Sequence, residues 1–449
     1  MRKLFGTDGI RGEANRYPMD AAMAFAVGQA VTHLMKRPEH APQVVIGRDT
    51  RISGYMLESA LVSGITSMGG NPCLVGVLPT PAIAFITRSI DADAGIMISA
   101  SHNPYKDNGI KIFSGGGFKL SDQQEEAIEK LVLNGNLPEM VPPPREMGRP
   151  KVLEDARSRY IAFLKNTFSR DLSMEEMKIA IDTANGATYK VAPEVFSELG
   201  ARVEVIHNNP DGLNINDNCG SQFTRDLEKH VIERRATVGL AFDGDGDRLN
   251  AVDEKGHKLT GDQILIICAK MLKDTGKLKN DLVVSTVMSN LGLAIACRKY
   301  GFKHHASKVG DRYVLADMQR LGSMIGGEES GHMIFLDHHT TGDGMITAIQ
   351  LIASMIKEGK PLSELAKMMD ILPQKLINVE VKSKPEISTI PKLAEAIKQV
   401  ETELGNQGRV LVRYSGTENL CRVMVEGPTV ELTETYCQQI ADVIRAALG

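Results

Sequence analysis

One pattern of hydrophobic and polar positions recurs through most of the chain. A short run of β-branched and other apolar residues leads into a turn rich in Gly, Asn or Asp, and an amphipathic stretch follows. This order is typical of β-α units whose strands run parallel in one sheet. The pattern predicts strands at residues 43–47, 73–77, 94–99, 178–182, 202–206, 238–242 and 281–286.

Polar side chains follow several of these strands directly. Asp49 comes after the first strand, residues 182–186 follow the strand that begins at Lys178, and Ser289 and Asn290 follow the last one. Open α/β sheets bind ligands at the carboxyl ends of their strands. We therefore expect functional side chains on these loops.

A proline-rich segment divides the chain. Five prolines fall within residues 137–150, which excludes a helix and a central strand there. The length of 449 residues allows roughly three to four domains. We predict three similar α/β domains with mixed, largely parallel sheets and then a smaller α+β domain. Their expected bounds are 1–150, 151–253, 254–369 and 370–449.

Composition and charge narrow the range of partners. With 42% hydrophobic and 24% charged residues the chain is typical of folded proteins, and its net charge of −4 makes nucleic acid and anionic membranes unexpected partners. The six cysteines are scattered without a C-x-x-C pair, which argues against a zinc site or a disulfide framework. The polar start has no apolar export signal, and no apolar run is long enough to span a bilayer. We expect a cytoplasmic protein with reduced thiols.

The sharpest local feature is the segment Asp243-Gly244-Asp245-Gly246-Asp247-Arg248, directly after the strand at 238–242. Alternation turns the three carboxylates to one side, and the glycines allow a tight loop. Oxygen-only ligands favour Mg²⁺ or Ca²⁺. An EF-hand loop is excluded because Arg248 occupies the position that needs glycine and because strands flank the loop. A metal site explains the pattern better than a solvated turn, and water or phosphate would complete the metal's coordination shell.

A serine at the end of another predicted strand could carry that phosphate. The strand at 94–99 runs into Ala100-Ser101-His102-Asn103-Pro104, and Lys111 lies just beyond. Read alone, this segment is more typical of a turn, and adjacency in sequence does not make a catalytic serine–histidine pair. The residues themselves make Ser101 a candidate for phosphorylation.

A glycine-rich loop at residues 326–332 could bind a sugar. Glu328, Ser330 and His332 supply a carboxylate, a hydroxyl and an imidazole, which suit sugar hydroxyls. An ordinary surface turn explains the segment about equally well.

A second loop, at residues 413–419, could bind phosphate. It combines the guanidinium of Arg413, the hydroxyls of Ser415 and Thr417, and free backbone amides around Gly416. The sequence contains no Walker loop and no dinucleotide fingerprint, so a nucleotide is not required.

Together with Phe5-Gly6-Thr7-Asp8-Gly9-Ile10-Arg11-Gly12, these motifs resemble the α-D-phosphohexomutase family in order and spacing over the whole chain. The resemblance implies four domains around a central cleft and a phosphoserine at Ser101. It also implies Mg²⁺ bound by that phosphate and the three aspartates, sugar contacts from Glu328 and Ser330, and substrate phosphate held by the last domain. The phosphate ligands implied there are Arg413, Ser415, Gly416, Thr417 and Arg422.

Within that family, Ser99 and residues 308–314 and 422–427 are similar to the members that act on glucosamine phosphates, whereas Glu329 and Asn419 depart from the usual pattern. The implied reaction interconverts glucosamine 6-phosphate and glucosamine 1-phosphate through glucosamine 1,6-bisphosphate, which also serves as activator. Its product would feed the synthesis of UDP-N-acetylglucosamine and cell-wall precursors. The family also implies a homodimer.

In this reaction Arg11 or Arg248 would stabilise charge on the transferring phosphoryl group, and Lys111 and His332 are candidates for acid and base. Three alternatives stay open. The same machinery could act on glucose or mannose phosphates, a phosphatase could release the phosphate of Ser101 to water, and a sensor could bind sugar phosphates without turnover.

Overall fold

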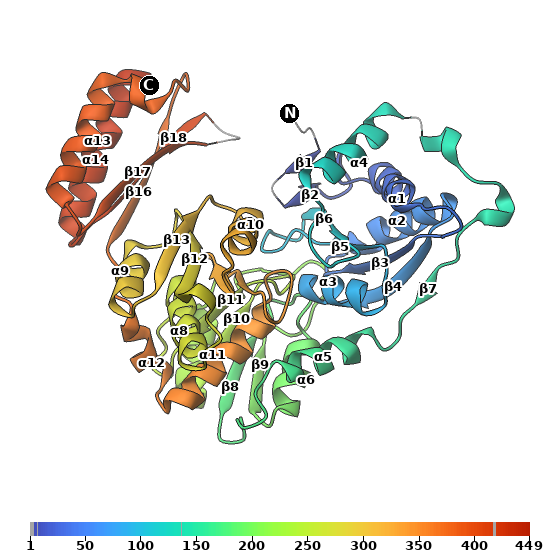
Figure 1. Cartoon of the computed structure of the whole chain (residues 1–449), viewed down its shortest axis with the longest axis horizontal. Helices are drawn as coiled ribbons and strands as arrows, with labels where there is room; N and C mark the ends of the chain where they lie inside the picture. Colours follow the sequence, from blue (N-terminus) through green and yellow to red (C-terminus); the bar gives the residue numbers. More distant parts are fainter. Residues whose placement is uncertain (1–3, 7, 136, 416–418) are drawn as a thin grey trace. The chain divides into compact units, whose positions relative to one another are not determined.

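The computed structural model describes residues 4–6, 8–135, 137–415 and 419–449. The chain forms two compact units. The first consists of Met1–Met288 and Phe302–Met368, and the second of Ser289–Gly301 and Met369–Gly449. Among the described residues, three sheets belong to the first unit and one to the second (Figure 1). This composition confirms the predicted mixed α/β architecture with a small C-terminal α+β part.

The first sheet has the strand order β1-β2-β6-β5-β3-β4-β7. Its strands β3, β4, β5 and β7 run parallel to one another, and β1, β2 and β6 add antiparallel pairs at one side. The strand bounds are β1 (Phe5–Gly6), β2 (Gly9–Glu13), β3 (Gln43–Arg48), β4 (Asn71–Val77), β5 (Ala94–Ile98), β6 (Asp107–Ser114) and β7 (Lys151–Val152). The helices of this region are α1 (Ala21–Met35), α2 (Gly54–Ser67), α3 (Thr80–Ser89) and α4 (Asp122–Asn134).

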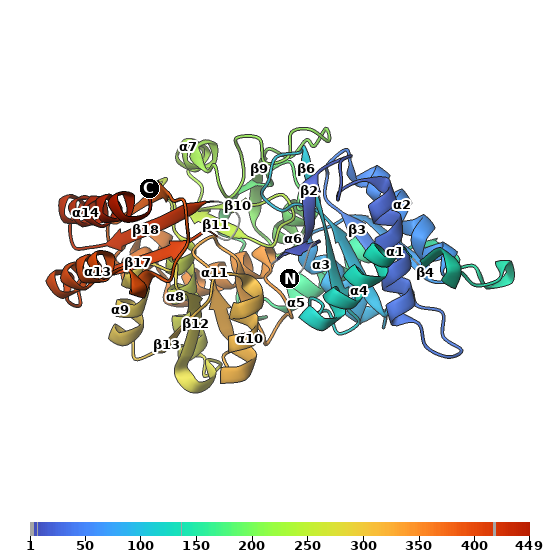
Figure 2. The ribbon, with the colours of Figure 1, turned by 90° about the horizontal axis from the view of Figure 1, so that it is seen from above.

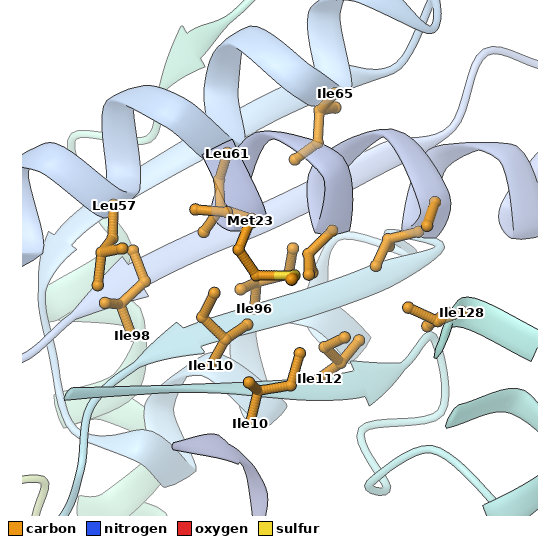
Figure 3. Packing of buried hydrophobic residues seen from close by; sticks show 14 of the residues in the cluster. Ile10, Met23, Leu57, Leu61, Ile65, Ile96, Ile98, Ile110, Ile112 and Ile128 are labelled. Carbon is orange, nitrogen blue, oxygen red and sulfur yellow. The ribbon is translucent and has the colours of Figure 1, made fainter. Parts of the chain in front are cut away.

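One face of this sheet packs against α1, α2 and α4. Alternate strand positions such as Ile96 and Ile110 meet Met23 of α1 and Leu61 of α2 in one buried cluster (Figure 3). The period of two along each strand places these side chains on the same face. Their burial explains why the apolar pattern identified these strands from sequence.

The opposite face receives α3 at close range, and glycine makes the approach feasible. A Cβ on Gly47 would lie 2.3 Å from Ile83 Cδ1, and one on Gly95 would lie 2.2 Å from Thr87 Oγ1. Both glycines occupy positions on parallel strands next to the residues that face α1 and α2. The sheet is therefore covered on both sides, as expected for parallel strands.

The second and third sheets repeat the central order of the first. Strands β6-β5-β3-β4 correspond to β11-β10-β8-β9 in the second sheet and to β15-β14-β12-β13 in the third. In each of these orders the first two strands are antiparallel to each other, namely β6 and β5, β11 and β10, and β15 and β14. The other neighbours are parallel. The shared order supports the expectation that the three α/β regions are similar.

The remaining elements of the first unit are the strands of these two sheets and the helices that accompany them. The strands are β8 (Lys178–Asp182), β9 (Arg202–Ile206), β10 (Val238–Phe242), β11 (Leu249–Val252), β12 (Leu282–Thr286), β13 (Lys303–Ser307), β14 (Ile325–Gly327) and β15 (Met333–Phe335). The helices are α5 (Ala156–Asn166), α6 (Val191–Glu198), α7 (Arg225–Arg234), α8 (Gly261–Asp274), α10 (Asp311–Leu321), α11 (Gly344–Glu358) and α12 (Leu362–Leu365). No described helix has the length and apolar character needed to cross a membrane.

The second unit is a three-stranded antiparallel sheet with helices packed against it (Figures 1 and 2). The sheet order is β16-β18-β17, and the bounds are β16 (Gln374–Glu380), β17 (Arg409–Tyr414), β18 (Leu420–Glu426), α13 (Pro391–Leu404) and α14 (Val430–Leu448). Helix α9 (Leu291–Lys299) also belongs to this unit, although it precedes β13 in sequence. The pattern of two helices and three strands was predictable, but the membership of α9 was not, because it depends on tertiary contacts.

The end of the first sheet differs from the predicted boundary at residue 150. The two-residue strand β7 follows the proline-rich segment and pairs in parallel with β4. A strand of two residues is too short to show a period of two, so the sequence pattern could not place it in the first sheet. The four domain bounds otherwise stay predictions.

Candidate active site

Three loops of the first unit carry the residues singled out in the sequence. Residues 99–106 connect β5 to β6, residues 243–248 connect β10 to β11, and residues 328–332 connect β14 to β15. Each loop is the turn of the antiparallel pair in its sheet, so the three loops hold equivalent places in the repeated order. Side chains from these loops contact one another as described below.

Ser101 lies in a strained turn and points at the acidic loop. Its φ of 53° is in the left-handed region that non-glycine residues seldom adopt. The residue is 1% exposed, and its Oγ donates a hydrogen bond of 2.7 Å to Oδ2 of Asp243. The Nδ1 atom of His102 lies 3.3 Å from the same Oγ. The fold thus brings the candidate phosphate carrier to the candidate metal ligands.

A buried arginine holds this turn in place. Arg51 is 0% exposed, and its guanidinium donates hydrogen bonds to carbonyl oxygens along the turn. Charge-assisted hydrogen bonds of this kind are stronger than neutral ones, and the planar fork fixes their directions. The acceptors are the backbone oxygens of Ser101 at 3.0 Å, Asn103 at 2.8 Å, Asp107 at 2.9 Å and Pro104.

Three polar side chains complete the support of the turn. Asp49 forms an ion pair of 2.8 Å with Arg51 and accepts a 2.6 Å hydrogen bond from Ser99 Oγ. Ser99 Oγ in turn accepts from the backbone N–H of Ser101 at 2.9 Å. From the second sheet region, Asn216 donates to the carbonyl oxygen of Ser101 at 2.9 Å. The left-handed backbone of Ser101 is therefore fixed from several directions.

The acidic triad after β10 fits a hard divalent cation. Carboxylate oxygens of Asp243, Asp245 and Asp247 all lie within 4.8 Å of one another, and the three residues are buried. Among the described residues, Oδ1 of Asp245 and Oδ1 of Asp247 have no hydrogen-bond partner. Burial, and then the carboxylates of Asp247 and Asp245, raise the pKa of Asp243 well above its usual range. A bound cation would be coordinated by these carboxylate oxygens and would relieve the excess negative charge.

Lys111 is surrounded by carboxylates. Its Nζ lies 2.8 Å from Asp245, 3.2 Å from Asp8 and 3.5 Å from Asp247, and the residue is 1% exposed. Burial opposes the charged form, but Asp245 and Asp8 raise the pKa of Lys111 above its ordinary value. The side chain is therefore held as an ammonium, which can donate a proton or stabilise charge but is not available as a base.

His332 is also held in its charged form. Its Nδ1 lies 3.7 Å from Asp247 and its Nε2 lies 3.7 Å from Asp311. Burial lowers its pKa, but Asp247 and then Asp311 raise the pKa of His332 to about 9. His102 behaves in the opposite way, because burial and Arg248 lower its pKa to about 4. Of these two imidazoles, the neutral one is beside Ser101.

Backbone pairing joins residues 328–332, the candidate sugar loop, to the acidic loop at residues 243–248. Arg248 and His332 form an antiparallel bridge, and the backbone N–H of Leu249 donates to Gly331 O at 3.1 Å. Gly331 has φ of 91°, and a Cβ there would lie 2.1 Å from Leu249 O, so only glycine fits. Residues 328–332 are consequently locked against the metal-site loop.

Glu328 and Ser330 differ in how far their polar atoms are engaged. Oε1 of Glu328 accepts from the backbone N–H of Gly310 at 3.0 Å. The Oγ atom of Ser330 is buried and has no hydrogen-bond partner among the described residues. An unpartnered hydroxyl is a ready donor or acceptor for a ligand hydroxyl.

A cavity of about 460 Å³ joins these groups. Its lining contains three cationic side chains, Arg11, Arg248 and His332, and the carboxylate of Glu328. Arg11 forms an ion pair with Asp8 and donates to Ala100 O at 3.2 Å, so it adjoins the Ser101 turn. A polar cavity of this size and charge suits a phosphorylated sugar. The described residues that line the cavity are Leu4, Gly6, Asp8, Gly9, Arg11, His102, Asp247, Arg248, Val309, Gly310, Asp311, Glu328 and His332.

The predicted phosphate loop belongs to the second unit. Arg413 on β17 pairs in register with Arg422 on β18, and Ser415 follows β17 and accepts a 2.8 Å hydrogen bond from Lys384 at its carbonyl oxygen. Gly416 and Thr417 lie outside the described residues. Two guanidinium groups at neighbouring register positions, close to the start of a loop, are consistent with anion binding.

Several site residues were not found by sequence reasoning. Arg51 and Asn216 hold the Ser101 turn but lie 50 and 115 residues away from it. Lys119 joins Asp8 to Asp311 at the cavity wall through two ion pairs. The position of Arg51 could have indicated its role, because it lies two residues after Asp49 and follows the same predicted strand. Asn216 gave no signal in the sequence.

Comparison with known proteins agrees with this geometry. Four family models of the phosphoglucomutase/phosphomannomutase type match in chain order: domain I at residues 2–138, domain II at 158–256, domain III at 260–371 and the C-terminal domain at 376–443. Phosphoglucosamine mutases from Syntrophobacter fumaroxidans and Syntrophus aciditrophicus are 72% and 62% identical to this chain over 449 residues, covering 100% of each protein.

Solved structures show the same fold. A phosphoglucomutase/phosphomannomutase family protein from Burkholderia thailandensis superposes with a TM-score of 0.80 at 22% identity, covering 100% of this chain and 98% of that one. The N-acetylphosphoglucosamine mutase of Aspergillus fumigatus, solved with GlcNAc-6P and magnesium, gives 0.71 at 16% identity, with coverage of 100% and 96%. The four matched domains and the full-length identity to named relatives establish that this chain belongs to the phosphoglucosamine mutases of the phosphoglucomutase/phosphomannomutase family.

Proposed function

We propose that the protein interconverts glucosamine 6-phosphate and glucosamine 1-phosphate by way of a phosphoryl group carried on Ser101. The observation that carries this proposal is the 2.7 Å contact between Ser101 Oγ and Asp243, with the serine held in a strained turn beside an acidic triad. The relatives at up to 72% identity are phosphoglucosamine mutases, which supports glucosamine as the sugar.

The reaction consists of two phosphoryl transfers. In the first, O1 of glucosamine 6-phosphate attacks the phosphorus on Ser101, so that the O1–P bond forms, the Oγ–P bond breaks and the proton of O1 passes to a base. Glucosamine 1,6-bisphosphate results and turns end for end. Oγ of Ser101 then attacks the phosphorus at O6, so that the Oγ–P bond forms again, the O6–P bond breaks and O6 takes up a proton, and glucosamine 1-phosphate leaves. The sum of atoms and charge is unchanged, as an isomerisation requires.

Charged side chains stabilise the transferring group. Lys111, Arg11 and Arg248 supply positive charge around the Ser101 turn and the acidic loop. Asp243, Asp245 and Asp247, with the phosphate on Ser101, would hold Mg²⁺, which neutralises charge on the phosphoryl oxygens when bound.

Proton transfer follows from the charge states of the neighbouring groups. Lys111 and His332 are held protonated, so we assign them to proton donation and charge stabilisation rather than to the base. The neutral imidazole of His102, 3.3 Å from Ser101 Oγ, is the better placed acceptor. This assignment adds His102 to the acid and base candidates.

Other groups orient the substrate. Glu328 and Ser330 would bind sugar hydroxyls, and the unpartnered Oγ of Ser330 supports this role. Arg413, Ser415 and Arg422, with Gly416 and Thr417, would hold the phosphate that is not reacting. Both orientations of the bisphosphate need such an anchor, because either phosphate must reach Ser101.

The test compares the wild type with Ser101→Ala and with Ser59→Ala, a control at an exposed serine of α2. Mutase activity is measured with Mg²⁺ and catalytic glucosamine 1,6-bisphosphate, and phosphorylation by intact-protein mass spectrometry. We expect the wild type and Ser59→Ala to be active and singly phosphorylated, and Ser101→Ala to be inactive and unphosphorylated. Full activity in Ser101→Ala would refute the phosphoserine mechanism.

The same assay separates the alternatives. A higher kcat/KM with glucose or mannose phosphates would change the sugar but keep the mechanism, and release of inorganic phosphate without isomerisation would indicate a phosphatase. The supply of UDP-N-acetylglucosamine and cell-wall precursors, a cytoplasmic location and a homodimer stay predictions of the family resemblance.

A further inference from the structure

A cluster of three potential metal ligands lies at the carboxyl ends of β8 and β9. Asp182 is the last residue of β8, His207 follows β9 directly, and Cys219 comes from the loop before α7. A carboxylate oxygen, a ring nitrogen and the Sγ atom lie within 4.8 Å of one another. Asp182 and Cys219 are buried, and the His207 side chain is 26% exposed, so solvent reaches one side of the cluster.

The charge balance at the end of β8 differs from that at the end of β3, the corresponding strand of the first sheet. There, buried Asp49 is neutralised by the guanidinium of Arg51 at 2.8 Å. Asp182 is as deeply buried, but its contacts are His207 Nδ1 at 3.0 Å and the backbone N–H groups of Ala184 at 2.8 Å and Gly220 at 2.9 Å. Within the described residues, Asp182 is paired with no guanidinium or ammonium group.

Two further carboxylates increase the negative charge. Burial, and then the carboxylates of Asp182, Asp217 and Asp226, raise the pKa of the Cys219 thiol to about 12, so all three carboxylates lie close enough to act on it. A region with three carboxylates, one imidazole and one thiol favours a cation that can bind several of them at once.

The orientation of His207 matches that of a metal-bound histidine. Its Nδ1 faces Asp182, and its Nε2 lies 3.5 Å from Oδ2 of Asp226. Metal-bound histidines usually bind through one nitrogen and donate the other N–H to a carboxylate, which fixes the ring. Asp226 is placed to accept that hydrogen bond.

We propose that Asp182, His207 and Cys219 bind a divalent transition-metal cation of the Zn²⁺ type, with water from the solvent side as the fourth ligand. A thiolate and an imidazole select such a cation over Mg²⁺, which prefers oxygen ligands. Ligand atoms at about 2.0–2.3 Å from Zn²⁺ are roughly 3.3–3.8 Å apart in a tetrahedral site. His207 Nδ1 and Asp182 Oδ2, which are 3.0 Å apart, would have to separate slightly, and the ligand atoms of the cluster all lie within 4.8 Å of one another. On binding, the Cys219 thiol and the Nδ1–H of His207 release any proton they carry to solvent.

The site would stabilise the support of the Ser101 turn. Cys219 belongs to the same loop as Asn216, which donates to the carbonyl oxygens of Ser101 and Asn103. The next residue, Gly220, is packed so tightly that a Cβ would lie 2.5 Å from Phe242 O, at the end of the strand that carries the acidic triad. A cation at Cys219 would therefore restrain a loop in contact with both parts of the active site, without contributing to the reaction itself.

Cobalt titration tests the proposal directly. Full-length, metal-stripped protein is kept in excess Mg²⁺ so that the acidic triad is saturated, and Co²⁺ is added while the thiolate-to-cobalt charge-transfer band is followed in the near ultraviolet. We expect one equivalent of Co²⁺ to develop the band, Zn²⁺ to remove it, and Zn²⁺ to raise the melting temperature of the wild type.

Cys219→Ser should abolish the band, whereas Cys268→Ser, a control at a buried thiol of α8, should retain it. His207→Gln is a second ligand variant at a partly exposed position, and it should weaken cobalt binding by about 10- to 100-fold or more. Absence of a thiolate band in the wild type, or an unchanged band in Cys219→Ser, would show that the cluster is only a hydrogen-bonded turn and would overturn the proposal. Because neither spectrum depends on turnover, the result is independent of the mutase assay.

Discussion

Arg51→Lys is expected to lower kcat strongly while leaving substrate affinity nearly unchanged. Lysine keeps the positive charge and can still pair with Asp49, but it lacks the planar fork with which Arg51 reaches four carbonyl oxygens of the Ser101 turn. The turn should then relax from the geometry that directs Ser101 Oγ at Asp243.

The magnitude follows from the hydrogen bonds that are lost. An ammonium in this position can serve the carboxylate and at most two of the carbonyls, so about two charge-assisted hydrogen bonds of roughly 1.5–3 kcal/mol each are removed. Because the two losses share one relaxation of the turn, we expect about 2–4 kcal/mol in total. If this free energy is lost from the transition state, kcat falls by roughly 30- to 1,000-fold.

Steady-state kinetics and the phosphorylation level of Ser101 check this prediction. KM should stay close to the wild-type value, because the sugar loop does not contact Arg51 in the described structure, and the fraction of phosphorylated enzyme should fall. Arg48→Lys is the control. Arg48 is buried at the end of β3, three residues before Arg51, pairs with Glu58 at 3.3 Å and stacks on Tyr55. Its replacement should lower the free energy of unfolding but change kcat much less than Arg51→Lys does. A folded Arg51→Lys protein with wild-type kcat would refute the argument.

Three further changes test other parts of the site. His332→Gln removes the stability that the ion pair with Asp247 contributes. Because the pKa of His332 in the folded protein, about 9, exceeds its value in the unfolded chain, the difference in unfolding free energy between wild type and variant should be largest below about pH 6.5 and shrink as the pH rises through 9. A difference that does not depend on pH would contradict this. Gly331→Ala should raise KM for sugar phosphate, because the new Cβ would clash with a backbone carbonyl. Gly276→Ala controls for backbone strain alone, since Gly276 also has a positive φ but open space around it. Equal KM values in the two variants would count against the locked loop. Asp245→Asn should weaken Mg²⁺ binding measured by calorimetry by about tenfold or more, and unchanged affinity would remove this residue from the metal site.

Local sequence was sufficient for the seven predicted strands, which correspond to β3, β4, β5, β8, β9, β10 and β12, and for the contiguous motifs. The strands at 178–182 and 238–242 were placed to the residue, because a buried parallel strand is a short apolar run bounded by turn residues. The acidic triad was recognised for a similar reason: its three carboxylates are separated by single glycines, so one loop contains all the ligands. The resemblance to a known family rested on motifs of this contiguous kind.

The charge states and the supporting contacts were not accessible in this way. The sequence made Lys111 a candidate for acid or base without deciding between the two roles, and only its position among three carboxylates, which raise its pKa, favours the protonated form. The scattered cysteines argued against a metal site, yet the ends of β8 and β9 place Cys219 beside two other potential ligands.

The sequence by itself therefore determined the apolar parallel strands and the loops that bear reactive groups, since each depends on residues that are neighbours along the chain. The order of strands in the sheets determined the rest: which loops meet, that Arg51 and Asn216 hold Ser101, and that Lys111 is enclosed by acidic side chains. Those contacts join residues 50 to more than 100 positions apart. Burial and pairing then set each group's protonation, which depends on the three-dimensional distribution of charge and cannot be assigned from residue type alone.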